Sequence, residues 1–180
     1  LAQVEPSPHN AVQKVIGLQA GQKAWRILIV DDDANNRALL LHYLAPLGFE
    51  LAEASNGQIG LDLAETFRPH LVLMDMRMPV MDGYLATSRL MSESQSWPEQ
   101  PVVVAVTASA FEDQRQEVLA AGCQDFLRKP VSEESVLAVI AKFLPVIYRY
   151  AEADSALFQP NSTWTSEQSI KALQTVPLAL

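Results

Sequence analysis

The sequence has a single cysteine, Cys123, among its 180 residues. An intramolecular disulfide bond therefore cannot form, and a metal site built from several thiolates is excluded. No apolar run approaches the roughly 18 residues that a membrane-spanning helix needs. A charged segment followed by an apolar one, the mark of a secretory signal peptide, is not found after Leu1. We therefore expect a cytoplasmic protein that makes no membrane contact through this chain.

Positive charge is also scarce, because 13 lysines and arginines stand against 21 aspartates and glutamates, for a net charge of -8. Binding to nucleic acid without sequence preference needs clustered Lys and Arg, so no nucleic-acid partner is expected. Hydrophobic residues make up 49% of the sequence and charged residues 19%, which is enough apolar material for a sizeable core. The composition predicts a folded domain rather than a disordered chain.

Three segments follow one another along the chain. Residues 1–24 contain scattered Pro and Gly without a sustained period, and we interpret them as a linker. Residues 25–146 alternate short apolar runs with helical stretches, and we predict that they form the domain. The sequence then becomes polar again, so residues 147–180 are expected to be a C-terminal linker or extension.

Five apolar runs are expected to be strands of one sheet. They are Ile27–Val30, Leu51–Ala54, Leu71–Met74, Val102–Val106 and Phe126–Leu127. The first, third and fourth are continuous rather than alternating, as in strands that are buried on both faces of a parallel sheet. Strict alternation of strands and helices predicts a doubly wound α/β fold, in which helices cover both faces of a five-stranded parallel sheet.

The expected helices have recognisable start and stop signals. In Asn35–Leu47 the apolar residues recur at helical spacing, and Gly48 supplies a stop. Ser55 and Ser109 each precede a Gln or Glu by three positions, which is the capping-box spacing at the start of a helix. Ser132, followed by two glutamates, begins the last helix.

Polar side chains follow four of the expected strands, at the ends where ligand sites form in doubly wound sheets. They are Asp31, Asp32, Asp33, Asp75, Thr107 and Lys129. Asp75 ends an apolar run, and a buried carboxylate needs a partner. Two like charges about 4 Å apart repel by roughly 4 kcal/mol at an effective dielectric constant of about 20. Carboxylates that meet from two strands therefore predict that a divalent cation binds between them. Mg²⁺ suits such a site, because it prefers oxygen ligands and accepts phosphate oxygens.

Each of these residues also has a simpler interpretation. An Asp run after a strand often forms a solvated turn, and Asp33 is the best candidate for a helix N-cap. Lys129 precedes a proline, as many surface lysines do, and Thr107 has the β-branched side chain that strands favour. Their arrival at consecutive strand ends favours a shared site, in which Lys129 adds a positive charge of the kind that binds phosphate.

Four stretches of the sequence resemble the motifs of response-regulator receiver domains of two-component systems, in family order and spacing. They are Ile27–Asp33, Leu73–Gly83, Val104–Ser109 and Asp125–Pro130. The resemblance covers Arg26 to Leu144, and the sequence around Asp75 is most similar to receivers of hybrid sensor histidine kinases. It implies a flavodoxin-like sheet with strand order 2-1-3-4-5 and a phospho-accepting role in a phosphorelay.

By this resemblance, Asp75 is the phosphoacceptor, the nucleophile that takes a phosphoryl group from a phosphohistidine or a small phosphodonor. The reaction would depend on Mg²⁺, held by Asp31, Asp32, Asp75 and the backbone carbonyl of Arg77. Charge neutralisation and alignment are what phosphoryl transfer chiefly needs, so the expected cation and Lys129 suit this reaction.

The resemblance also assigns a switch. Thr107 would donate its hydroxyl to a phosphoryl oxygen, and the small Ala108 would let the backbone approach. Phe126 would be the aromatic residue that follows the movement of Thr107; it lacks the hydroxyl of the Tyr that many relatives have there. The simpler interpretation of Phe126 is an ordinary core aromatic. The output surface would lie around Phe111–Leu144.

The implied partner is a phosphohistidine donor, either a histidine kinase or a phosphotransfer domain. Whether phosphorylation drives formation of a homodimer stays open. The resemblance also implies self-catalysed phosphotransfer and dephosphorylation. No ATP-binding segment is found in the sequence, so this chain would accept a phosphoryl group without generating it from ATP, and the parent chain would be a hybrid histidine kinase.

Two other functions compete with this interpretation. A phosphatase of the haloacid dehalogenase type also uses an aspartate nucleophile, but it needs a second Asp two residues later, where Arg77 stands. A receiver that is never phosphorylated and acts only in protein interaction is the other alternative. The presence of Asp75, Thr107 and Lys129 together argues against it.

Overall fold

Continuous apolar runs form the central sheet in the computed structural model, which describes residues 14–108 and 112–151. The strands of this sheet are β2 (Arg26–Val30), β3 (Glu50–Ala54), β4 (Leu71–Asp75), β5 (Val102–Thr107) and β6 (Asp125–Arg128). They pair in parallel in the order β3-β2-β4-β5-β6, which is 2-1-3-4-5 when the strands of this sheet are numbered alone. The predicted fold and strand order are confirmed, and each strand is as long as its apolar run or slightly longer.

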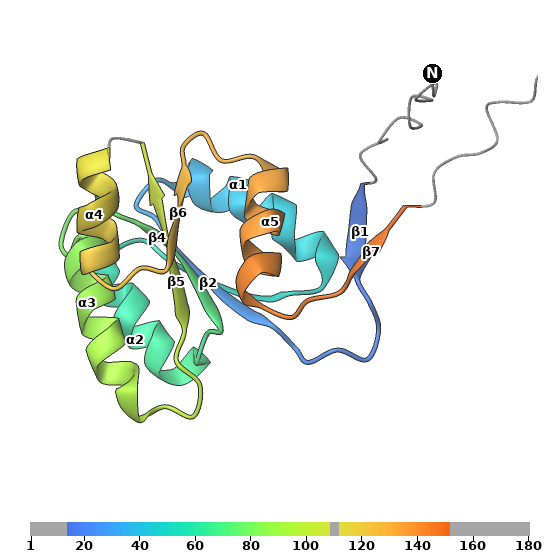
Figure 1. Cartoon of the computed structure of the whole chain (residues 1–180), viewed down its shortest axis with the longest axis horizontal. Helices are drawn as coiled ribbons and strands as arrows, with labels where there is room; N and C mark the ends of the chain where they lie inside the picture. The colour runs from blue at the N-terminus through green and yellow to red at the C-terminus, as the bar shows by residue number, and fades with distance from the viewer. Residues whose placement is uncertain (1–13, 109–111, 152–180) are drawn as a thin grey trace, which may run out of the picture. The chain divides into compact units, whose positions relative to one another are not determined.

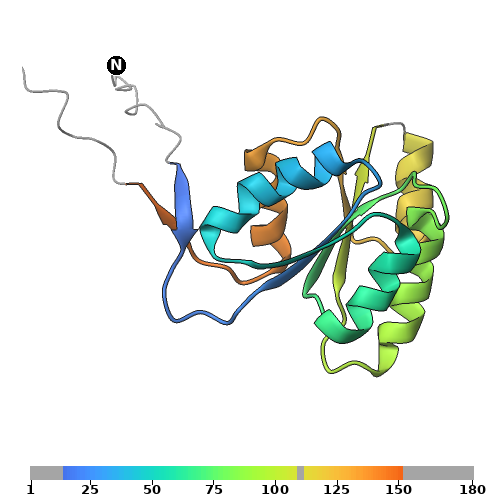
Figure 2. The same ribbon diagram turned by 180° about the vertical axis from the view of Figure 1, so that it is seen from behind.

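Helices cover both faces of the sheet (Figures 1 and 2). They are α1 (Ala34–Leu44), α2 (Gly57–Phe67), α3 (Gly83–Glu93), α4 (Glu112–Ala120) and α5 (Glu133–Phe143), with short 3-10 helices η1 (Ala45–Leu47) and η2 (Ser94–Ser96). Helices α1 and α5 lie on one face, and α2, α3 and α4 lie on the other. None of the helices that the structure describes is long and apolar enough to cross a membrane.

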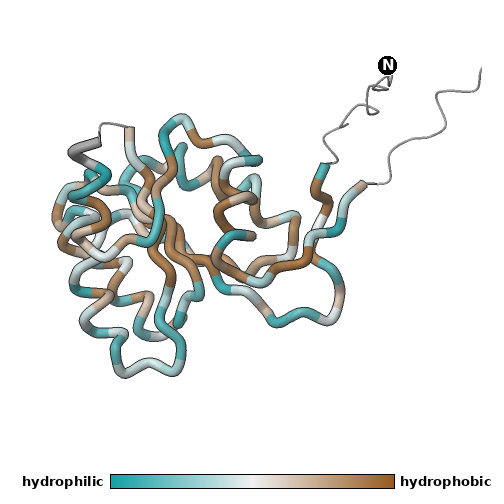
Figure 3. Tube along the Cα trace, viewed as in Figure 1, coloured by the Kyte–Doolittle hydropathy of each residue, from teal (hydrophilic) through white to brown (hydrophobic). Residues whose placement is uncertain are grey.

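Two cores form because successive strand side chains point to opposite faces of the sheet. In β2, Ile27 and Ile29 pack in the core beneath α1 and α5, whereas Leu28 and Val30 pack in the core beneath α2 and α3. The brown strands in the middle of Figure 3 mark this apolar centre. Complete burial of one such side chain contributes about 1.5–3 kcal/mol to the stability of the fold. The sheet is therefore a stable support for the residues at its edges.

Helix boundaries follow local capping chemistry, with two corrections to the predictions. The predicted helix Asn35–Leu47 ends as an α-helix at Leu44 and continues as η1, because Pro46 has no N–H for the helical ladder. The N-cap of α2 is Asn56 rather than Ser55: Asn56 Oδ1 accepts a hydrogen bond from Ile59 N–H at 3.0 Å.

Other predicted caps are confirmed. Asp33 caps α1 through a 2.8 Å hydrogen bond from Asn35 N–H to Oδ1, and Ser132 caps α5. Gly48 follows η1 with φ of 98°, in the left-handed region that favours glycine. The predicted start at Ser109 lies outside the described residues.

A two-stranded antiparallel ribbon lies within the ranges that we interpreted as linkers. Strand β1 (Val15–Leu18) pairs with β7 (Tyr148–Tyr150). The Gln22 side chain bonds both backbone groups of Ile147, at 2.7 and 2.8 Å, and Tyr148 Oη donates to the Leu137 carbonyl of α5 at 2.9 Å. The compact unit therefore extends over Lys14–Ala151.

Candidate functional site

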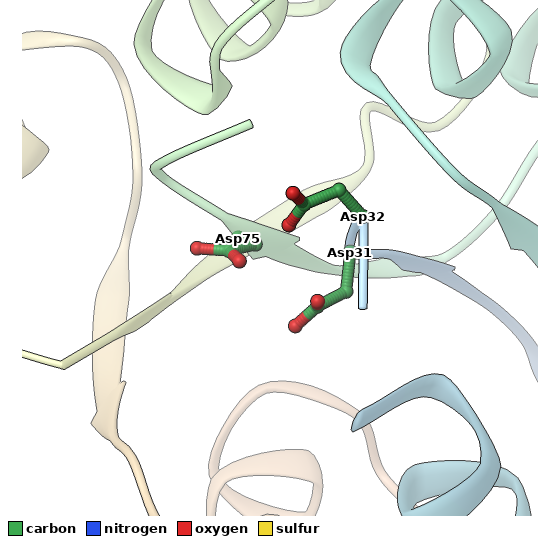
Figure 4. A group of neighbouring side chains, drawn as sticks. All are labelled: Asp31, Asp32 and Asp75. Atoms are coloured by element: carbon green, nitrogen blue, oxygen red, sulfur yellow. The ribbon is translucent and has the colours of Figure 1, made fainter. Parts of the chain in front are cut away.

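The carboxyl ends of β2 and β4 bring three aspartates together. Because the two strands are parallel neighbours, Asp31 and Asp32 follow β2 beside Asp75 at the end of β4. One carboxylate oxygen from each residue lies within 4.8 Å of the others (Figure 4). Asp31 and Asp75 are buried, with 2% and 6% exposure, whereas Asp32 is exposed. The cluster therefore opens to solvent on the side of Asp32.

Both buried carboxylates are held in place at each of their oxygens. Asp31 Oδ1 accepts from Asp33 N–H at 2.9 Å, and Asp75 Oδ1 accepts from Arg77 N–H at 3.1 Å. The second oxygen of each carboxylate contacts Lys129, whose Nζ donates to Asp31 Oδ2 at 2.8 Å and to Asp75 Oδ2 at 2.7 Å. Lys129 thus bridges the ends of two strands from the loop after a third.

The electrostatics of the site follow from burial and this bridge. Burial raises the pKa of Asp75 above its usual range, and the hydrogen bonds from Lys129 and Arg77 offset part of that rise. Burial alone lowers the pKa of Lys129, but its hydrogen bonds to Asp31 and Asp75 outweigh burial and raise it. Lys129 is therefore an ammonium ion at neutral pH.

The donor set of the cluster suits a hard divalent cation. Carboxylate oxygens are the ligands that Mg²⁺ and Ca²⁺ prefer, and the exposed side at Asp32 leaves room for the waters that Mg²⁺ retains. With all groups ionised, the three carboxylates outnumber the single ammonium of Lys129 by two negative charges. An acidic cluster of this kind can bind a metal, and a cation would remove the remaining repulsion.

Arg37 supports the same edge, and no sequence signal pointed to it. Its Nη1 donates to the carbonyl oxygens of Asp31 at 2.8 Å and Asp32 at 3.3 Å, while Nε pairs with Glu53 at 3.2 Å. Asn36 Nδ2 also donates to Asp31 Oδ1 at 3.2 Å. Both residues lie in the first turns of α1, so that helix orients the acidic turn before it.

The loop after Asp75 approaches the strand closely at Gly83. A methyl group at this position would overlap the Asp75 carbonyl oxygen and would lie 2.7 Å from Met76 Cα. Asp82, immediately before it, caps α3 through a 2.8 Å bond from Leu85 N–H. The loop can therefore lie this close to the end of β4 only because position 83 is a glycine.

Val80 is in an unusual conformation in this loop. Its φ is 71°, its side chain is 85% exposed, and Met81 N–H donates to the Pro79 carbonyl at 2.8 Å across it. A hydrogen bond between residues two apart, with a positive φ at the residue between them, is the strained form of the γ-turn. Strain of this type concentrates near functional sites.

The residues predicted to form a switch lie at the end of β5, directly after it, and on β6. Thr107 ends β5 and is buried, and its carbonyl accepts from Lys129 N–H at 2.8 Å; Ala108 follows and is exposed. Phe126 pairs with β5 further from the edge and is half-buried against the core of the α2 face. The Arg115 guanidinium lies 5.9 Å from its ring centroid.

Comparison with known proteins gives consistent results. Residues 27–141 match the response regulator receiver domain family. Hybrid signal transduction histidine kinase G of Dictyostelium discoideum is 36% identical over 127 residues, which are 69% of this chain and 4% of that protein. The chain therefore spans only a small part of this curated relative.

Two solved structures resemble the fold. The receiver domain of sensor histidine kinase PA1611 from Pseudomonas aeruginosa, which has a magnesium ion in its active site cleft, has a TM-score of 0.61 and 30% identity, over 67% of this chain and 98% of its own. The receiver of Ssk1 from Saccharomyces cerevisiae, crystallised with the phosphotransfer protein Ypd1, has a TM-score of 0.63 and 27% identity, over 66% of this chain and 88% of its own.

The fold and the site together define a doubly wound signalling domain with an acidic edge. This chain belongs to the response regulator receiver family, the receiver domains of two-component phosphorelays. The sequence left open a receiver domain and a phosphatase of the haloacid dehalogenase type. Membership of the receiver family decides against the phosphatase.

Proposed function

We propose that Asp75 is the phosphoacceptor of this receiver domain. The observation that carries the proposal is the Lys129 bridge, in which one ammonium contacts Asp75 Oδ2 at 2.7 Å within an acidic cluster. Asp75 is the member of the cluster that lies at the end of the central strand β4 and is also held by Arg77 N–H. Its position is thereby defined before a phosphodonor arrives, as a nucleophile in phosphoryl transfer requires.

The proposed cofactor is Mg²⁺, with Asp31, Asp32, Asp75 and the backbone carbonyl of Arg77 as its protein ligands. The open side at Asp32 supports this choice, because Mg²⁺ keeps several waters and accepts phosphate oxygens. When bound, Mg²⁺ supplies positive charge that offsets the negative charge of the transferring phosphoryl group. The magnesium ion in the related receiver of PA1611 gives the proposal independent support.

In the proposed reaction, an Asp75 carboxylate oxygen attacks the phosphorus of a phosphohistidine. A P–O bond to Asp75 forms as the P–N bond breaks, and the electron pair of that bond stays on the donor imidazole, which takes up a proton. Lys129 neutralises charge on the phosphoryl oxygens, and the Thr107 hydroxyl donates a hydrogen bond to one of them. The acyl phosphate is then hydrolysed in a self-catalysed step, in which water attacks the phosphorus, the P–O bond to Asp75 breaks, inorganic phosphate leaves and the Asp75 carboxylate is restored.

The proposed switch couples Thr107 to Phe126. Phosphorylation adds negative charge and acceptor oxygens at Asp75, which draw the Thr107 hydroxyl toward them. Ala108 leaves space for the backbone, and the half-buried Phe126 ring then moves inward on the neighbouring strand β6. The output surface would lie on residues 112–144, where α4, β6 and α5 are found; Phe111, with which we predicted that it begins, lies outside the described residues.

The proposed partner is a phosphohistidine donor on a histidine kinase or a phosphotransfer domain, as in the complex of Ypd1 with the Ssk1 receiver. We place the chain in a hybrid histidine kinase, in keeping with its Dictyostelium relative. The ranges 1–24, 25–146 and 147–180 stay our proposal for linker, receiver and extension, with β1 and β7 as the parts of the first and last range that join the compact unit. The cytoplasmic location rests on sequence signals alone.

The test is labelling of the purified chain by acetyl phosphate and Mg²⁺, followed by intact mass spectrometry. We expect one added phosphoryl group on the wild type and none on Asp75→Asn or in the presence of EDTA. Lys129→Ala should label at least about tenfold more slowly, because a charge-assisted contact is lost.

The matched control is Asp33→Asn, which removes one carboxylate from the same turn but keeps an N-capping side chain. It should label as the wild type does. Equal labelling of the wild type and Asp75→Asn would refute the assignment. Failure of the folded wild type to label would favour the receiver that acts only in protein interaction.

A further inference from the structure

A second polar site lies at the opposite end of the strands from Asp75. There, a cleft of about 320 Å³ is lined by Arg26, Arg68, His70, Trp97 and Glu99, together with two prolines. Arg26 is the first residue of β2, and His70 immediately precedes β4, so the cleft is at the amino-terminal edge of the sheet. No residue of this cleft belongs to the acidic cluster.

Neither arginine of the cleft has a carboxylate partner among residues 14–108 and 112–151. Arg26 Nε donates to the Arg68 carbonyl at 2.8 Å, and in the described part of the chain no hydrogen bond or ion pair engages its Nη atoms. The Arg68 side chain likewise has no acceptor there. Its guanidinium carbon lies 4.0 Å from the centroid of the Trp97 ring, an arrangement that orients the guanidinium and leaves its N–H groups available.

His70 provides a buried donor for which the described part of the chain supplies no acceptor. Its Nδ1 accepts a hydrogen bond from Arg26 N–H at 3.0 Å, so the proton of the neutral ring is on Nε2. Nε2 is buried and has no hydrogen-bond partner among the described residues, and the side chain is only 5% exposed. Burial, together with the charges of Arg26 and Lys23, lowers the pKa of His70, so the ring is neutral at pH 7.

The single acid that lines the cleft is already compensated. Glu99 Oε2 lies 2.6 Å from Lys23 Nζ, and it is 3.4 Å from His70 Nε2 without the alignment of a hydrogen bond. Arg26 and Arg68 therefore leave an excess of positive charge in the cleft, in a chain whose net charge is -8. The cleft offers donors and positive charge, and a complementary ligand must supply acceptors and negative charge.

We propose that this cleft binds a small organic anion through a carboxylate or phosphate group. Arg26, Arg68 and His70 Nε2 donate hydrogen bonds to the oxyanion, since a guanidinium matches the spacing of two such oxygens. Trp97 and the neighbouring Pro69 and Pro98 contact the apolar part of the ligand. The site is separate from the phosphorylation chemistry and does not depend on it.

The test is an NMR titration of the whole chain with sodium phosphate and, separately, with sodium benzoate, at constant ionic strength. The indole N–H of Trp97 and the ring signals of His70 report on the cleft, and Lys129 reports on the acidic edge. We expect saturable shifts at Trp97 and His70 with at least one of the two anions. Saturation by phosphate or by benzoate identifies which oxyanion class the cleft prefers.

Three variants test whether the charged residues of the cleft determine the affinity for the anion. Arg68→Gln removes a donor and should weaken binding at least about tenfold, whereas Glu99→Gln removes the only acid of the cleft and should strengthen binding severalfold. Arg89→Gln removes the same charge from an exposed position on α3 and should leave the affinity unchanged. Thermal unfolding of each variant verifies that it is folded.

The proposal is overturned if neither anion produces saturable shifts at Trp97 and His70. It is also overturned if Arg68→Gln binds as tightly as the wild type, or if Arg89→Gln loses as much affinity as Arg68→Gln, because that result would mean attraction by overall charge.

Discussion

Lys129 Nζ lies 2.7 Å from Asp75 Oδ2, which makes this lysine the counter-ion of the proposed phosphoacceptor. Replacing Lys129 with Met should leave the acidic cluster without its cation. We expect Mg²⁺ to stabilise the variant more than it stabilises the wild type, because the metal then relieves more repulsion. For the wild type, a Mg²⁺ concentration of 100 times the Kd should add about 2.7 kcal/mol to the free energy of unfolding, which is measured as a shift in Tm.

The control for this experiment is Asp32→Asn, which removes a proposed ligand and keeps the Lys129 bridge. Its Tm should respond weakly to Mg²⁺, while Asp33→Asn should respond as the wild type does. A smaller Mg²⁺ response in Lys129→Met than in the wild type would contradict the role of Lys129 as the counter-ion of the cluster.

Gly83→Ala should destabilise the domain by about 3 kcal/mol, because its methyl group would overlap the Asp75 carbonyl and the backbone must move. Chemical denaturation measures the change. Gly17→Ala is the control, since its added carbon would meet the nearest atom, Arg149 Nη2, at 3.4 Å, an ordinary contact. We expect the control to change stability by less than about 0.5 kcal/mol. Similar stability of the two variants would disprove the steric argument.

Val80→Gly should stabilise the domain relative to Val80→Ala by about 1 kcal/mol. Both changes remove an 85% exposed side chain, so packing contributes little to either. Only glycine relieves the strain of φ at 71°, and the relief exceeds the extra chain entropy that glycine gives the unfolded state. Unfolding in urea distinguishes the two, and lower stability of the glycine variant would show that the turn is unstrained.

His70 should make stability fall as the pH is lowered below the usual histidine pKa of 6.5. Burial, with the charges of Arg26 and Lys23, lowers its folded-state pKa below the usual 6.5, while Glu99 and Glu50 partly offset this. The folded state therefore prefers the neutral ring. The resulting stability is fully present above pH 6.5 and is lost as the pH falls toward the lowered pKa.

The measurement is the free energy of unfolding at several pH values in this range. His70→Asn keeps an acceptor near Arg26 N–H but does not titrate, so it should flatten the slope. His42→Asn, which removes an exposed histidine on α1, should leave the slope unchanged. A wild-type slope that survives in His70→Asn would assign the dependence to other groups.

The acidic edge could be predicted because it depends on a simple geometric rule. Parallel strands run in one direction, so residues that follow β2 and β4 must meet at one edge of the sheet. The alternation of strands and helices therefore put Asp31 and Asp75 at the same edge, and the strand order implied by the family resemblance made their strands neighbours. The bridge by Lys129 follows from the same rule, although its distances do not.

Local chemistry predicted helix starts within about one residue. Asn56 and Ser55 are both good N-caps, and the choice between them depends on the backbone contact of Gly57 N–H with the Met81 carbonyl, 3.1 Å away. That contact joins two segments of the chain, so no local pattern contains it.

By itself, the sequence determined the doubly wound sheet and the residues that follow its strands, because apolar periodicity and the alternation of strands and helices can be read within single segments of the chain. Only the tertiary structure decided the β1–β7 ribbon and the cleft at His70. Both depend on segments far apart in the chain: Val15 pairs with Tyr150, and Arg26 N–H meets His70 Nδ1. Such pairings arise when the core closes and brings those backbones into register, so periodicity within one segment cannot encode them.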